Sequence, residues 1–285
     1  IYQYSLFSLP RITGVSTPDE ALELLDTTRF DIVILMVGID KETPLQLSEQ
    51  IKQKKPGLPV YILLNQKSNI KYFEDIVPTM HSVNKLFVWS GNSQIFFAIV
   101  KLIEDEANVE NDTRIGLVRI ILLVEDSAQY YSKYLQILYS IVFGQVQQVL
   151  PEVEKNELDK ICRMRSRPKI LHARTYEDAM YTFNKYKDNM LCVISDVEFE
   201  NDGKPDKSAG IKFIKYIKSH ILNLPILLQS SEPSNEQLAR SLNVGFINKN
   251  SDTLLNDLKN FLTYYLGFGD FVFRNREGKP IAIAK

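Results

Sequence analysis

Polar residues able to bind a cation or a phosphoryl group follow four apolar segments in the second half of the chain. They are Glu125 and Asp126, Asp196, Ser230 and Ser231, and Lys249. Clustered carboxylates repel one another and favour a hard cation such as Mg²⁺, which takes oxygen ligands. A carboxylate beside Mg²⁺ can attack phosphorus, and a hydroxyl and an ammonium can then hold the phosphoryl oxygens. The set therefore predicts magnesium-dependent phosphoryl transfer to an aspartate.

The segments before these residues predict a parallel sheet that would bring the polar groups together. Short apolar runs alternate with helical patterns, which is typical of βαβ units. In the second half the runs cover residues 119–124, 169–173, 191–195, 225–228 and 244–247. Ligands of such sheets bind outside the carboxyl ends of the strands, so residues from four strand ends would meet at one edge. We expect five strands alternating with five helices here.

The first half repeats the pattern without the chemistry. Apolar runs predict strands at 30–37, 59–64 and 85–89, residues 4–15 are expected to form a strand before them, and the first strand of the repeat is missing. The positions that match Asp196, Ser230 and Lys249 are occupied by Met36, Leu64 and Ser90. Because a methionine cannot accept a phosphoryl group, we expect a scaffold or interaction module.

Length and composition indicate two globular domains. The chain has 285 residues, and a domain has roughly 150. The acidic segment 104–112 lacks an apolar period and indicates a helix end followed by a linker. We expect a first domain at 1–107, a linker at 108–118, a second domain at 119–266 and the start of a further region at 267–285.

Charge and cysteine content exclude several classes of function. Lysine and arginine total 34 and aspartate and glutamate 35, a net charge of −1, so we expect no nucleic-acid partner bound through bulk charge. No apolar run approaches the ~18 residues of a membrane span, so no membrane partner is expected. Two cysteines are too few for a disulfide scaffold, and a reducing cytoplasm is the expected location.

Four motifs of the second half resemble the landmarks of response-regulator receiver domains. They are Ile121–Ser127, Val193–Asp196, Leu228–Ser231 and Phe246–Lys249. The resemblance covers about residues 119–266. It implies a flavodoxin-like α/β fold, with a five-stranded parallel sheet of order 2-1-3-4-5 flanked by helices. The first half is then a degenerate receiver domain of the same fold, which lacks its first strand.

The same resemblance implies how a phosphoryl group would be held. Asp196 is the implied phosphoacceptor. Ser230, Ser231 and Lys249 are the implied phosphoryl-binding residues, and Phe246 is the implied aromatic switch residue. The implied phosphodonor is a histidine kinase or a small molecule, and phosphorylation would alter contact with another subunit, such as in a homodimer.

The resemblance also implies a set of Mg²⁺ ligands. Asp126 and Asp196 would ligate Mg²⁺ directly, Glu125 through a water molecule and Glu198 through its main-chain carbonyl. The chain departs from the family in two loops, because Asn250 stands where proline often follows the lysine and the loop at 199–209 is long and charged.

The second half is also longer than the family pattern. The excess lies near 145–167, where apolar spacing predicts an extra helix. This helix is either a docking element or an elaborated surface helix.

A second resemblance concerns the tandem order of the two halves. The runs at 162–171, 225–233 and 267–274 resemble a bacterial family in which two receiver-like domains precede a region similar to phosphoenolpyruvate synthase or pyruvate phosphate dikinase. This implies that the chain is an amino-terminal fragment whose partner is the following catalytic region. The chain shows no phosphohistidine motif or nucleotide-binding loop, so the fragment itself is not expected to be an enzyme.

Two other hypotheses remain open at this stage. Both halves could be scaffolds for dimerisation or for docking, without phosphorylation. A phosphatase of the haloacid dehalogenase type also uses Mg²⁺ and an aspartate at a strand end, but it requires a second aspartate two residues later, where this chain has Glu198.

Overall fold

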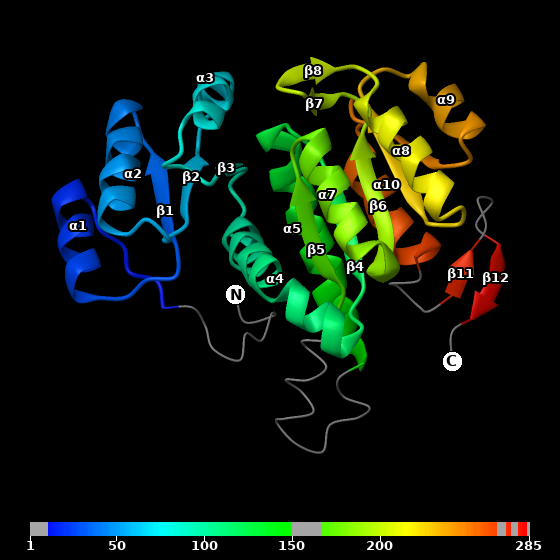
Figure 1. Ribbon diagram of the computed structural model, residues 1–285, viewed down its shortest axis with the longest axis horizontal. Coiled ribbons are helices and arrows are strands. Elements are labelled where there is room, and N and C mark those ends of the chain that lie inside the picture. The colour runs from blue at the N-terminus through cyan, green and yellow to red at the C-terminus, as the bar shows by residue number, and fades with distance from the viewer. Residues whose placement is uncertain (1–10, 150–166, 267–271, 275–278, 284–285) are drawn as a thin grey trace. The chain divides into compact units, whose positions relative to one another are not determined.

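The computed structural model describes residues 11–149, 167–266, 272–274 and 279–283, which form two compact units (Figure 1). Unit 1 extends to Ile95 and includes Ser127–Ser132, and unit 2 comprises Phe96–Asp126 and the chain from Lys133 onward. Both units have parallel sheets flanked by helices, so the predicted α/β class is confirmed. No helix within the described ranges has the length and apolar character needed to cross a membrane.

Unit 1 contains a sheet of three parallel strands in the order β1-β2-β3. Its elements are α1 (Pro18–Thr27), β1 (Val33–Val37), α2 (Glu42–Lys54), β2 (Val60–Leu64), α3 (Ile70–Ile76) and β3 (Lys85–Val88), with single 3₁₀ turns at Lys67–Asn69 and Val77–Thr79. The three strands predicted in the middle of this half are confirmed. The strand expected at 4–15 is not found at 11–15, which have no regular structure, and 1–10 lie outside the described residues.

Helix α4 (Gln94–Gly116) continues through most of the segment expected to be a linker, which corrects that expectation. This segment packs within unit 2, because Val109 is buried and Asp112 pairs with Lys169 at 2.8 Å. The acidic run before it also carries a buried charge. Asp105 is fully buried, and its Oδ1 lies 2.6 Å from Nη2 of Arg167, while its Oδ2 accepts a hydrogen bond from the Ile170 amide at 2.9 Å. An acidic run is typical of a solvated segment, but a buried arginine allows one of these acids to face the core.

The division between the units also differs from the predicted boundary at residue 107. It falls at Ile95, because most of α4 packs within unit 2. The first turn of α5 (Ala128–Val149) in turn belongs to unit 1, where Oγ of Ser132 accepts a hydrogen bond from the Val88 amide at 3.0 Å. Neither contact could be inferred from composition.

Unit 2 is built on five parallel strands in the order β5-β4-β6-β9-β10, an arrangement compatible with flavodoxin-like folds. The strands are β4 (Ile120–Val124), β5 (Lys169–Ala173), β6 (Met190–Asp196), β9 (Ile226–Ser230) and β10 (Gly245–Asn248). Every residue of β4 and β9 is buried, as expected of strands covered on both faces. The five apolar runs therefore correspond to the five strands, with ends that differ by at most two residues.

Helices cover both faces of this sheet (Figure 1). They are α5, α7 (Tyr176–Tyr186), α8 (Ala209–His220), α9 (Asn235–Ser241) and α10 (Leu254–Asn260), with a 3₁₀ turn at Lys187–Asn189 after α7 and a π-helical turn at Phe261–Tyr265 after α10. Thr175 caps α7 by accepting a hydrogen bond from the Asp178 amide. Phe183 of α7 and Phe213 of α8 meet edge to face, with centroids 6.1 Å apart. This contact packs α7 against α8.

The long loop after β6 forms a hairpin of β7 (Phe199–Asn201) and β8 (Lys204–Asp206). Its two turn residues, Asp202 and Gly203, have φ angles of 53° and 71°. Positive φ at both positions is the geometry that an Asp-Gly pair favours in a tight hairpin.

Two further parts of the predicted organisation fall wholly or partly outside the described residues. Of the extra helix expected near 145–167, residues 145–149 belong to α5 and 150–166 are not described. In the expected start of a further region, β11 (Val272–Arg274) and β12 (Pro280–Ile283) pair antiparallel.

Candidate functional site

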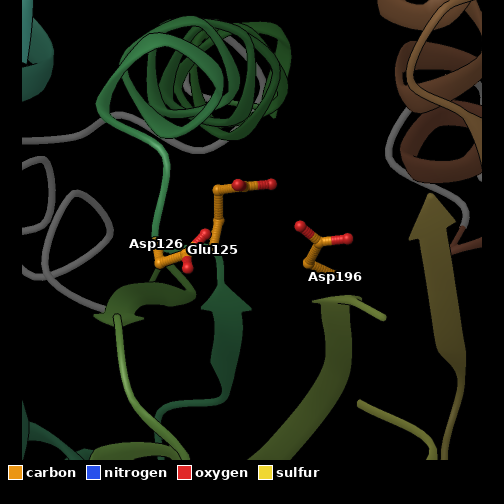
Figure 2. Close-up of side chains that lie close together, drawn as sticks. All are labelled: Glu125, Asp126 and Asp196. Carbon is orange, nitrogen blue, oxygen red and sulfur yellow. The ribbon is translucent and has the colours of Figure 1, made fainter. Parts of the chain in front are cut away.

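Three carboxylates meet at the carboxyl ends of β4 and β6. Glu125 and Asp126 follow β4, and Asp196 is the last residue of β6, which pairs with β4 through Val124 and Ser195. Each acid offers an oxygen atom that lies within 4.8 Å of those of the other two. Figure 2 shows the carboxylates of Glu125 and Asp196 facing one another. The parallel sheet therefore brings together the acids predicted from the sequence.

Lys249 joins this cluster from the end of β10. Its Nζ donates a hydrogen bond to Oε1 of Glu125 at 2.9 Å and contacts Oδ2 of Asp196. The Lys249 amide also donates to the Ser230 carbonyl at 2.8 Å, which extends the pairing of β9 and β10 to this residue. With 8% of its surface exposed, Lys249 is a buried cation held by buried acids. A lysine at a strand end is more often solvated, so this placement is informative.

The predicted hydroxyls lie beside the cluster in different environments. Ser230 is buried, and its Oγ accepts hydrogen bonds from the Glu232 amide at 3.1 Å and from Nδ2 of Asn235 at 2.9 Å. Ser231 is exposed, and its carbonyl accepts a hydrogen bond from Asn250. Ser230 is thus linked to the start of α9, whereas the Ser231 side chain faces solvent.

The roles of Glu198 and Phe246 stay predictions. The Glu198 side chain is exposed and is not a member of the three-carboxylate cluster, and its implied contact with a metal is through the main chain. Phe246 is half-buried and packs against the apolar core of unit 2.

Burial makes the cluster electrostatically costly. Burial raises the pKa of Glu125 and of Asp196, although Lys249 opposes both shifts. Burial, reinforced by the charge of Asp196, raises the pKa of Asp126 to about 6. Burial tends to lower the pKa of Lys249, but its attraction to Glu125 and Asp196 outweighs this, so its pKa is raised and it stays charged. The three acids therefore hold protons to a higher pH than exposed carboxylates do, and the positive charges of Lys249 and Arg174 favour their ionised forms.

The donor set fits a hard divalent cation. All three groups are carboxylates, the ligand type that Mg²⁺ prefers, and no sulfur or imidazole belongs to the cluster. Glu125, Asp126 and Asp196 are the residues that would hold the ion, and its charge would offset their mutual repulsion.

Mg²⁺ affinity is expected to rise with pH. Below its pKa of about 6 Asp126 is protonated, so a proton competes with the cation, and above it the carboxylate is free to bind. Between pH ~5 and pH ~7.5 the ionised fraction of Asp126 rises from about a tenth to nearly all, and the raised pKa values of Glu125 and Asp196 act in the same direction. A fall of at least about tenfold in the Mg²⁺ dissociation constant is therefore expected. Isothermal titration calorimetry at the two pH values measures this. Equal affinity at both would show that Asp126 does not bind the ion.

The sequence analysis missed two residues that shape the site. Gln229 donates a hydrogen bond from Nε2 to Oε2 of Glu125 at 3.0 Å. Gly210 lies against the end of β6, where an added Cβ atom would be 2.0 Å from the Asp196 carbonyl oxygen. In the sequence, Gln229 is recognisable as a polar residue that directly follows three apolar residues of the same strand. Nothing local marks Gly210, because its importance comes from the packing of α8 on β6.

Comparison with known proteins adds no further assignment, since no protein-family model matches the chain and no curated protein matches it significantly.

Proposed function

We propose that unit 2 is a phosphoacceptor domain of the receiver type, in which Asp196 accepts a phosphoryl group in a Mg²⁺-dependent reaction. The observation that carries the proposal is the contact of Lys249 with Asp196 inside a cluster of three carboxylates at the carboxyl edge of the sheet. The strand order supports it, because β5-β4-β6-β9-β10 corresponds to 2-1-3-4-5 when these five strands are counted along the chain.

In the proposed reaction a carboxylate oxygen of Asp196 attacks the phosphorus of a histidine kinase's phosphohistidine or of a small phosphodonor such as acetyl phosphate. A new oxygen–phosphorus bond forms. With acetyl phosphate, the bond between phosphorus and the bridging oxygen breaks, and acetate leaves with the electron pair. With phosphohistidine, the bond between phosphorus and the ring nitrogen breaks, and the imidazole leaves with the electron pair and takes up a proton. Bound Mg²⁺ would supply positive charge to the phosphoryl oxygens. Lys249, which contacts Asp196, supplies a second positive charge.

The same residues would convert phosphorylation into a conformational change. A phosphoryl group on Asp196 offers new acceptor oxygens to Lys249 and to the hydroxyl of Ser230. Ser230 is hydrogen-bonded to the Glu232 amide and to Asn235 at the start of α9, so movement of Ser230 would displace the start of this helix. We propose that Phe246 turns inward with it and that the face around α9 and α10 repacks.

We propose that unit 1 is a receiver-like module that is not phosphorylated. At the end of β1, where the resemblance requires an acid, Met36 is 51% exposed. We propose that unit 1 is a scaffold or interaction module. The resemblance to proteins with a following phosphoenolpyruvate synthase-like region extends the proposal to control of such a region by unit 2.

A scaffold without phosphorylation is the second candidate, and the ion pairs of Lys249 favour it. Glu125 and Asp196 already share this ammonium, so the buried charges are partly neutralised without any ligand. A purely structural ion network would look similar.

Beryllofluoride separates the two candidates, because it mimics a phosphoryl group bound to an aspartate. We expect wild-type protein to bind it only with Mg²⁺ present and the Asp196→Asn variant not to bind, as measured by fluorine NMR. A wild-type protein that does not bind beryllofluoride in the presence of Mg²⁺ would leave the scaffold as the better account.

A further inference from the structure

Gln229 is a buried polar residue at the centre of the site whose role the proposed reaction does not explain. It is the fourth residue of β9, directly before Ser230, and only 2% of its surface is exposed. The three residues before it, Ile226, Leu227 and Leu228, are buried and apolar. A buried amide is costly unless it is hydrogen-bonded, so this position requires a specific partner.

The partner of the Gln229 side chain is Glu125. Nε2 of Gln229 donates to Oε2 of Glu125 at 3.0 Å, while Nζ of Lys249 lies 2.9 Å from Oε1 and 2.7 Å from Oε2. The carboxylate is therefore held by donors to both of its oxygens. Because Glu125 is fully buried, no solvent is available to replace either donor.

The backbone of Gln229 is fixed to the strand that carries Asp196. The two residues are Cα partners in the pairing of β6 and β9, and the Gln229 carbonyl accepts a hydrogen bond from the Val197 amide at 3.0 Å. One residue thus connects the end of β6 to the Glu125 side chain. This connection adds to the direct pairing of β4 with β6 and to the contacts of Lys249 with both acids.

The Gln229 amide is an uncharged donor, which is important for the charge of the site. A second lysine at this position would compete with a cation for the acids, and an apolar side chain would leave Oε2 of Glu125 without this donor. A neutral donor orients the carboxylate and preserves the negative charge of the cluster. Groups that orient metal-binding side chains in this way typically change metal affinity by about 10–100-fold when they are removed.

We propose that Gln229 is a positioning residue that sets the Mg²⁺ affinity of the phosphoacceptor site by holding the Glu125 carboxylate. The inference rests on the proposed function of unit 2. Gln229 does not touch the reacting atoms, so it should determine how much Mg²⁺ the reaction needs and leave the rate at saturating Mg²⁺ unchanged.

The test compares wild type with Gln229→Met, which keeps the side-chain length and removes the donor. We expect the Mg²⁺ concentration for half-maximal labelling by acetyl phosphate to rise about tenfold, with the rate at saturating Mg²⁺ unchanged within about twofold. Calorimetry of the unphosphorylated protein with MgCl₂ alone should show the same loss of affinity. Gln229→Asn, whose amide is too short to reach Glu125, should behave similarly and serves as a second variant if the first folds poorly.

Ile226→Val is the matched control, since Ile226 is buried in the same strand at the end remote from the site. It should lower the thermal midpoint slightly and leave the Mg²⁺ dependence at the wild-type value. The inference alone fails if wild type binds Mg²⁺ and is labelled while Gln229→Met has the same Mg²⁺ dependence, or loses only its maximal rate. If wild type neither binds Mg²⁺ nor is labelled, the proposed function fails, and this inference with it.

Discussion

Replacement of Lys249 by methionine is expected to lower the free energy of unfolding by about 3–5 kcal/mol at neutral pH. The side chain is 6% exposed and lies 2.7 Å from Oε2 of the fully buried Glu125, and it also contacts Asp196. Methionine has a similar length and fills the space, but it removes the only ammonium that these two carboxylates share among the described residues. Denaturant unfolding monitored by circular dichroism measures the change.

The loss should depend on pH with a defined sign. Burial holds the pKa of Glu125 and of Asp196 above the values of the unfolded chain, so the folded protein binds more protons and its stability falls as pH rises through this range. Without Lys249 both pKa values rise further. The penalty should therefore be smaller at pH ~5 than at pH ~8, because protonation of the carboxylates offsets the loss of the ammonium.

Magnesium and a surface lysine provide the controls for this prediction. Mg²⁺ should stabilise Lys249→Met more than wild type, since it replaces the lost positive charge. Lys54→Met removes an ion pair to Asp26 in which both side chains are exposed, and should change stability little. If Lys249→Met were as stable as wild type at every pH, the buried ion network would not exist in solution.

Gly210→Ala is expected to damage the site more than the fold. The new Cβ atom would lie 2.0 Å from the Asp196 carbonyl oxygen and 2.9 Å from Cα of Val197. Both are backbone atoms that cannot rotate away, so α8 or the end of β6 must move. Overpacking of this kind costs about 1–3 kcal/mol, which exceeds the gain of about 1 kcal/mol from alanine in a helix. We expect Mg²⁺ affinity and labelling of Asp196 to fall by at least about tenfold, because displacement of about 1 Å is enough to lose that much.

Gly144→Ala is the matched control for this substitution. Gly144 lies in α5, and an added Cβ atom would meet nothing within 4 Å. The same change should therefore stabilise the protein by up to about 1 kcal/mol and leave labelling intact. Equal effects of the two substitutions on Mg²⁺ affinity would show that the close approach of α8 to Asp196 is not needed.

The parts of the fold that were predicted correctly depend on local sequence. Runs such as 120–124 are apolar throughout and short, which is sufficient to identify buried parallel strands. Since their carboxyl ends share one edge, the positions of Glu125, Asp126, Asp196 and Lys249 followed from the strands alone. This reasoning needs no side-chain geometry, and the structure brings these four residues together.

The parts that were not predicted depend on partners distant in sequence. Asp105 is helical and buried because Arg167 lies beside it, so the composition of 104–112 was misleading. Gly210 and Gln229 act through contacts with Asp196 and Glu125 that only the packed sheet creates. The hairpin at 199–206 is different, because its Asp202-Gly203 turn is a local sequence signal for a tight hairpin.

Mass spectrometry after incubation with acetyl phosphate tests whether Asp196 is a Mg²⁺-dependent phosphoacceptor. We expect the intact protein to gain the mass of one phosphoryl group only when Mg²⁺ is present. Peptide analysis should locate the group on Asp196, and Asp196→Asn should gain none. Wild-type protein that stays unmodified with Mg²⁺, or Asp196→Asn modified to the same extent as wild type, would contradict the account.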